Sequence, residues 1–114
     1  MLTSGDVVEL DLGLPTGSEA GFRHPAVVVT AQRILDAAPS VIQVVPLTSR
    51  LRAFSSEVEI DPHPANGLDR RSAAQCHHVR AVSTRRTDSV RGNVGPAALA
   101  QIREVLAVVL DIPT

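Results

Sequence analysis

Residues 21–30 have the sequence GFRHPAVVVT, and this stretch decides the fold. Arg23 and His24 stand directly before Pro25, and small and β-branched apolar residues follow. Proline fixes φ and has no N–H, so it is well placed at the start of a strand. The apolar run after it is typical of a buried strand. The pattern therefore predicts a core strand over residues 24–30, with two polar side chains held where the preceding loop meets it.

The other apolar segments predict a small antiparallel sheet around this strand. Four of them have the alternation or the β-branched residues of strands: 7–12, 41–46, 56–60 and 73–83, the last with room for one or two strands. Residues 13–21 and 61–69 are rich in Gly, Pro and Asn or Ser and are interpreted as loops. Residues 85–95 are charged and contain Gly, and no strand is assigned to them.

Two helices complete the predicted fold. A short one is expected over residues 31–38, with Thr30 as its N-cap. A longer one is expected over residues 96–110, where Pro96 suits the first turn and apolar residues recur at three- and four-residue spacing. We therefore expect one domain over residues 1–114, mainly β (α+β): a curled antiparallel sheet or partial barrel with a C-terminal helix across it.

Composition narrows the possible functions. Trp and Tyr are absent, so an aromatic platform for stacking bases is not expected. All eleven cationic residues are Arg, and six of them, with two His, fall within residues 70–91, which predicts a basic surface on a chain of net charge −1. The single cysteine, Cys76, allows no internal disulfide and is expected as buried packing. No apolar run of membrane-spanning length or signal-peptide pattern occurs, so a cytoplasmic protein without a membrane segment is expected.

Metal and nucleotide sites are disfavoured by spacing. Cys76, His77 and His78 are contiguous, and on a strand adjacent side chains point to opposite faces, so the three do not form a ligand set. The loop over residues 13–21 has three Gly but no Lys and does not precede a helix, so it is not a phosphate-binding loop. We expect no metal and no cofactor.

Cleavage of RNA needs few protein groups, because the 2′-OH of the substrate is the nucleophile. A proton carrier, a cation for the phosphate and a hydroxyl donor suffice. Histidine is the side chain suited to carrying a proton near neutral pH, which makes His24 a candidate, and Arg23 can hold a phosphate. The start of one strand and the end of an antiparallel neighbour lie at the same end of a sheet. His24 and Thr48 are therefore expected close together if their strands pair.

An ordered set of motifs now points to a known family. These are GDVV at residues 5–8, GSE at 17–19, RHPAVVV at 23–29, VPLTS at 45–49, CHHVR at 76–80 and GNV at 92–94. With them the chain resembles the MazF/PemK family of toxin endoribonucleases (mRNA interferases) almost end to end. The resemblance implies a small SH3-like barrel of the MazF/CcdB type that works as a homodimer and is neutralised by a cognate MazE-like antitoxin. It implies metal-independent, sequence-selective cleavage of single-stranded RNA to a 2′,3′-cyclic phosphate and a 5′-OH, which inhibits translation and growth.

The resemblance also assigns site residues, with one departure. The family's catalytic Arg stands directly before the strand proline, where this chain has His24; either Arg23 supplies the cation from one position earlier, or His24 has taken over as proton carrier. We expect Arg23→Ala to lose more activity than His24→Ala. Thr48 matches the catalytic hydroxyl. Substrate contacts are implied for four further residues: Glu19, a loop acid; Ser49, beside Thr48; His77, where some members have Asp; and Arg80, which binds phosphate or supports the sheet.

Two hypotheses without catalysis remain as alternatives. The displaced Arg favours a binding module of the same fold that acts on gyrase or another protein. A plain structural or regulatory barrel, using the basic segment over residues 70–91 as a nucleic-acid surface, is the other.

Overall fold

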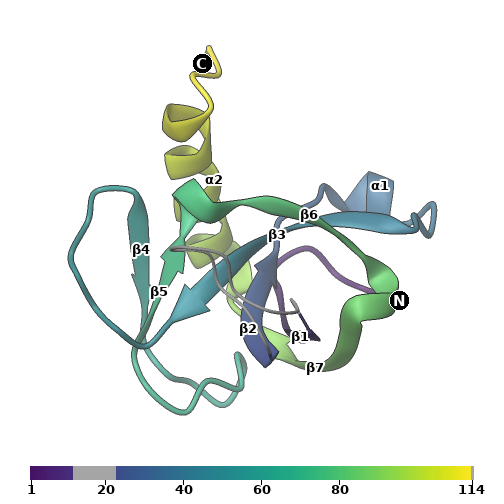
Figure 1. Ribbon diagram of the computed structural model, residues 1–114, viewed down its shortest axis with the longest axis horizontal. Helices are drawn as coiled ribbons and strands as arrows, with labels where there is room; N and C mark the ends of the chain where they lie inside the picture. The colour runs from purple at the N-terminus through teal and green to yellow at the C-terminus, as the bar shows by residue number, and fades with distance from the viewer. Residues whose placement is uncertain (12–22, 114) are drawn as a thin grey trace.

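The structure, a computed structural model, describes residues 1–11 and 23–113. Its strands are β1 (Asp6–Asp11), β2 (Arg23–Val28), β3 (Val41–Thr48), β4 (Glu57–Ile60), β5 (Ser72–Gln75), β6 (Arg80–Ser83) and β7 (Thr87–Asn93). The helices are α1 (Gln32–Leu35) and α2 (Gly95–Val109), with 3₁₀ turns η1 (Cys76–His78) and η2 (Thr84–Arg86). Strands make one curled sheet, and α2 stands against one side of it (Figure 1).

The sheet curls around β3, its longest strand. The strand order is β4-β5-β3-β2-β1-β7, and β6 also pairs with β3; each pair is antiparallel. β3 pairs with β6 along residues 41–44 and with β5 along residues 47–48, so it belongs to both halves of the sheet. Among the described strands β4 and β7 do not pair with each other, so the sheet is open. The curled sheet predicted from the sequence is confirmed, in its partial rather than closed form.

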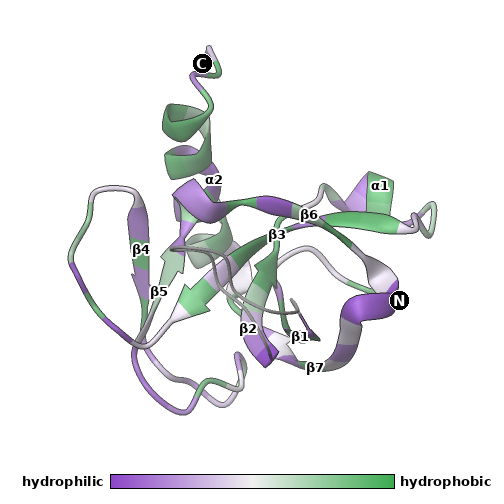
Figure 2. Ribbon diagram, viewed as in Figure 1, coloured by the Kyte–Doolittle hydropathy of each residue, from purple (hydrophilic) through white to green (hydrophobic). Residues whose placement is uncertain are grey.

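Alternation along the central strands gives the sheet two apolar faces. Val7, Val27 and Val45 pack on one side with Ile102 and Leu106 of α2. The opposite side holds a second cluster: Val8, Leu10, Ala26, Val28, Leu35, Ile42, Val44 and Val82. Figure 2 shows β3 as mostly hydrophobic, while the η2 segment that precedes β7 is hydrophilic. The core consists mainly of aliphatic residues, as the composition predicts, and both β2 and β3 contribute to it.

Three local predictions are wrong. Thr30 does not cap α1, because its hydroxyl is used across the sheet: Oγ1 accepts from the Gln43 N–H and donates to Gln43 Oε1, both at 2.8 Å, and Ala31 is the cap residue. Cys76–His78 is a 3₁₀ turn and not part of a strand. The charged segment before α2 contains β7, which pairs with β1 through two register shifts. No helix in the described residues is long and apolar enough to cross a membrane.

Candidate active site

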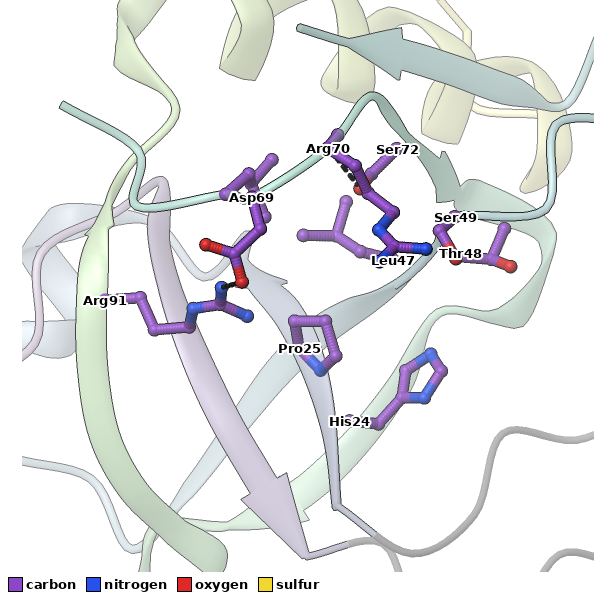
Figure 3. A pocket seen from close by; sticks show the side chains of 10 residues that line it. His24, Pro25, Leu47, Thr48, Ser49, Asp69, Arg70, Ser72 and Arg91 are labelled. Atoms are coloured by element: carbon purple, nitrogen blue, oxygen red, sulfur yellow. Dashed lines mark hydrogen bonds and ion pairs between the residues drawn. The ribbon is translucent and has the colours of Figure 1, made fainter. Parts of the chain in front are cut away.

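A pocket opens where β2 and β3 part. Their ladder ends at Ala26 opposite Pro46, and continuing that register by two residues brings His24 opposite Thr48. Leu47 and Thr48 pair instead with β5, so β3 turns away from β2 at this point. The resulting pocket has a volume of about 240 Å³. Its lining, drawn in Figure 3, is His24, Pro25, Leu47, Thr48, Ser49, Leu68, Asp69, Arg70, Ser72 and Arg91.

His24 lines this pocket and carries an unsatisfied ring nitrogen. Its Nε2 is buried and has no hydrogen-bond partner within the described residues. Leaving a buried polar atom unpaired costs about 1–3 kcal/mol, so this nitrogen favours a hydrogen-bonding partner. An imidazole nitrogen can accept a proton or donate one, depending on its protonation state. His24 is thus equipped to transfer a proton.

Thr48 brings a hydroxyl that donates no hydrogen bond within the described residues. Its Oγ1 accepts a hydrogen bond from the Arg50 N–H at 3.1 Å. This bond fixes the position of the oxygen, and it uses a lone pair and not the O–H. The hydroxyl can therefore donate to an anion in the pocket. Ser49, beside it and exposed, lines the same pocket.

The wall opposite His24 comes from the loop over residues 61–69. Buried Asn66 organises this loop: its Oδ1 accepts from the N–H groups of His63 and Leu68 at 3.1 and 3.0 Å, and its Nδ2 donates to the Asp61 carbonyl at 2.9 Å. Gly67 lies directly against β7, where a Cβ would overlap the Arg91 carbonyl oxygen. These contacts hold the loop in place as one wall of the pocket.

Two arginines line the pocket, and their environments differ. The Arg91 guanidinium donates to the Gly67 carbonyl at 2.9 Å and pairs with Asp69 at 3.3 Å and Glu9 at 3.5 Å. Two carboxylates therefore compensate its charge. The Arg70 guanidinium makes no hydrogen bond or ion pair within the described residues, and it is exposed. In Figure 3 it extends toward Thr48 and Ser49.

The structure separates the predicted site residues into two groups. His24, Thr48 and Ser49 come together in the pocket. Arg23 does not line it, and pairs instead with Asp88 of β7. Glu19 lies outside the described residues.

His77 and Arg80 also lie away from the pocket lining. The His77 ring is exposed; its Nδ1 is 2.9 Å from Ser56 Oγ and its centroid is 4.2 Å from that of His78. Arg80 begins β6, opposite Val44 of β3. Arg70, Asp69 and Arg91 also line the pocket, and they were not predicted as site residues from the sequence. The only signals for them were the clustering of Arg over residues 70–91 and the dense loop before it.

Cys76 is not a candidate nucleophile. Its side chain is fully buried in the cluster beneath α2. Burial raises the pKa of the thiol to about 11; a backbone hydrogen bond opposes this and the charge of Glu57 adds to it. The thiolate is the reactive form, so the buried thiol is unreactive near neutral pH, in agreement with the packing role expected from the sequence.

The fold and the pocket define a class of protein: a small α+β domain with a polar site between the diverging ends of two core strands. Comparison with family models gives the family. Residues 3–110 match the PemK-like, MazF-like toxin of type II toxin–antitoxin systems, and the chain belongs to this family. It is thus a MazF-type toxin component, as the motif set predicted.

Relatives of known name or structure agree with this assignment. The chain is 34% identical over 117 residues to the endoribonuclease MazF9 of Mycobacterium tuberculosis, with 98% of both chains covered. MazF from Deinococcus radiodurans superposes with a TM-score of 0.80 at 25% identity, covering 96% of each chain. A mycobacterial endoribonuclease solved with its cognate antitoxin superposes at 0.77, with 19% identity and coverage of 100% of this chain and 99% of that one, which supports the fold.

Proposed function

We propose that this toxin is a metal-independent, sequence-selective endoribonuclease whose catalytic groups include His24 and Thr48. The observation that carries the proposal is that these two residues line one pocket, where, among the described residues, the His24 ring nitrogen Nε2 has no hydrogen-bond partner and the Thr48 O–H donates no hydrogen bond. A proton carrier and a hydroxyl donor on one phosphate are the groups that cleavage by the 2′-OH requires. The name of the M. tuberculosis relative supports the same activity.

The proposed reaction is an internal transesterification. The 2′-oxygen forms a bond to phosphorus, and the bond from phosphorus to the 5′-oxygen breaks. The 2′-OH loses a proton and the 5′-oxygen gains one; His24 carries one of these transfers and water the other. The Thr48 hydroxyl donates to a non-bridging oxygen as negative charge grows there. The products are a 2′,3′-cyclic phosphate and a 5′-OH, and no water is consumed in this step.

The biological partners are proposed on the same basis. RNA is the substrate, and cleavage of messages in the cytoplasm inhibits translation and growth. A MazE-like antitoxin neutralises the protein, as the solved complexes of relatives suggest. We also infer a homodimer, from the resemblance to the family. Ser49 contacts the substrate beside Thr48. His77 and Arg80 are proposed as RNA contacts outside the pocket, from the turn and strand that follow β5, and Glu19 is proposed as a further RNA contact.

The test is cleavage of a long single-stranded RNA by purified protein in EDTA, with the cut sites mapped. We expect discrete cuts bearing a 2′,3′-cyclic phosphate. A single 2′-deoxy nucleotide on the 5′ side of a mapped cut should abolish that cut, because the nucleophile is gone. His24→Ala and Thr48→Ala should each lose at least about 100-fold in rate. Thr3→Ala, which removes an exposed hydroxyl outside the pocket, is the matched control.

Two results would overturn the proposal. Cleavage that persists at the deoxy position would mean that the 2′-OH is not the nucleophile. Growth inhibition that survives both pocket substitutions while RNA stays intact would favour the alternative activity, binding to gyrase or another protein.

A further inference from the structure

Resting on the proposed ribonuclease activity, we propose that Arg70 supplies the positive charge that binds the reacting phosphate. In this chain the position before the strand proline is His24 and not Arg, so the cation must come from elsewhere. Two guanidinium groups line the pocket, those of Arg70 and Arg91, and a third, that of Arg23, belongs to the residue before His24.

Two of these groups are already engaged. Arg23 pairs with Asp88 and is absent from the pocket lining. Arg91 is bound by Asp69, Glu9 and the Gly67 carbonyl, and these contacts tie the loop over residues 61–69 to β7 and β1. Moving Arg91 onto a substrate would break the wall of the pocket. Its role is therefore structural.

Arg70 is the arginine of the pocket that has no counter-charge among the described residues. Asp69 also lines the pocket, but Arg91 neutralises it. Among the described residues that line the pocket, Arg70 is thus the arginine without an ionic partner, and a positive charge of this kind attracts anions. In Figure 3 its side chain extends toward the side of the pocket formed by Ser49 and Thr48, and all three residues line the pocket, so a phosphate bound there can contact both Arg70 and Thr48.

The backbone holds Arg70 in place for this role. Its carbonyl accepts a hydrogen bond from Ser72 Oγ at 3.1 Å, and buried Ser72 begins β5 opposite Ile60 of β4. The next residue, Arg71, points elsewhere and pairs with Glu59 at 3.0 Å and Asp61 at 3.2 Å. Arg71 therefore has carboxylate partners, whereas Arg70 lines the pocket.

A guanidinium suits the chemistry of this step. Its planar fork can donate two hydrogen bonds to the non-bridging oxygens of a phosphate. The charge on those oxygens grows as the 2′-oxygen adds to phosphorus, so the interaction strengthens in the transition state. Arg70 should thus contribute to kcat as well as to binding.

The experiment compares Arg70→Ala, Arg70→Lys and the control Arg71→Ala in two arms. The first arm measures binding of a 2′-O-methyl RNA, which cannot be cleaved by 2′-OH attack, as a function of salt. Arg70→Ala should lower the affinity and reduce the slope of log K against log salt by about 0.7, the value for one phosphate contact on a single strand. Arg71→Ala should keep the wild-type slope. An unchanged slope in Arg70→Ala, or no binding by the wild type, would refute the role of Arg70 whether or not RNA is cut.

The second arm measures cleavage. We expect Arg70→Ala to lose about 100- to 1,000-fold in kcat, Arg70→Lys to lose less, and Arg71→Ala to stay within about twofold. Added ethylguanidinium should restore part of the Arg70→Ala activity, an effect that a purely structural role would not give. If wild-type protein binds through Arg70 but does not cut RNA, the proposed activity fails while the phosphate contact stands. Full activity in Arg70→Ala would remove Arg70 from the reaction.

Discussion

Arg23 and Asp88 form an ion pair that joins the first residue of β2 to the edge strand β7. Side chains alternate along a strand, so Arg23 and His24 point to opposite sides of β2, and of these two residues His24 lines the pocket. The pair is exposed, with 70% and 37% of the side chains accessible, so its contribution to stability is small. Its importance lies in holding the guanidinium at a different place from the reacting phosphate.

The Arg23–Asp88 pair changes the order of activity loss expected from the sequence alone. We predict that His24→Ala loses at least about 100-fold in kcat, as expected for removal of a proton carrier, whereas Arg23→Ala loses less than about fivefold. Initial rates on one mapped cut site would measure both. Asp88→Asn, which frees Arg23, is the matched control and should retain activity. A larger loss in Arg23→Ala than in His24→Ala would return the phosphate-binding role to Arg23.

Thr48 offers a test of the hydroxyl itself. Thr48→Ala removes a donor to the phosphate and should lower kcat by about 100- to 1,000-fold, as for one donor to a developing oxyanion. Thr48→Ser keeps the O–H and its bond from the Arg50 N–H, so it should recover most of the rate. Steady-state kinetics on one substrate would separate kcat from KM. Equal losses in the Ala and Ser variants would mean that the methyl group, and not the hydroxyl, is required.

The strands of the core were predictable because their signals are local. β-Branched runs bounded by a proline, Pro25 at the start of one and Pro46 at the end of the other, placed β2 and β3 within two residues of their observed bounds, and the antiparallel arrangement brought His24 and Thr48 to one pocket as expected. β7 was missed because it is an edge strand with polar residues, and two register shifts break its alternation. The strand predicted over residues 73–83 wrongly included Cys76–His78, because nothing in the composition of these three residues distinguishes a 3₁₀ turn from a strand.

The rest of the pocket depends on contacts between distant segments. Arg70 enters the site because the loop over residues 61–69 folds onto β7, and that packing needs glycine at both Gly67 and Gly92. No local pattern connects these positions. The compensation of Arg91 by Asp69 and Glu9 is likewise set by tertiary structure, so the sequence could indicate a basic segment but not which arginine is uncompensated.

Gly67 provides a test of this loop packing. It has φ +68°, and a Cβ there would overlap the Arg91 carbonyl oxygen, so Gly67→Ala combines backbone strain with a steric clash. Gly95→Ala is the matched control, because Gly95 has φ +87° but no atom within 4 Å of the added Cβ. We expect Gly95→Ala to cost about 1–2 kcal/mol from the left-handed φ alone, and Gly67→Ala to cost clearly more and to lower RNA cleavage. Urea unfolding measures the free energies. Equal costs would show that the loop yields without strain.

Cys76 gives a prediction for stability at high pH. Burial raises the pKa of its thiol to about 11, so between pH 9 and 11 the unfolded chain loses this proton while the folded chain keeps it. The contribution of the protonated thiol to the free energy of unfolding is therefore complete below the pKa of the unfolded thiol and is lost as pH rises. The total loss is about 2–3 kcal/mol, at 1.36 kcal/mol per pKa unit.

The amino-acid composition allows the titration of Cys76 to be measured without interference from other side chains. The chain has no Lys and no Tyr, and Arg ionises well above this range, so Cys76 is the one side chain that titrates between pH 9 and 11. In Cys76→Ala the free energy of unfolding should be lower at pH 7, because packing is lost, but nearly constant from pH 9 to 11. Urea unfolding of both proteins at pH 7, 9, 10 and 11 measures the two slopes. If the free energy of unfolding falls equally with pH in the wild type and in Cys76→Ala, another group, and not the buried thiol, controls stability at high pH.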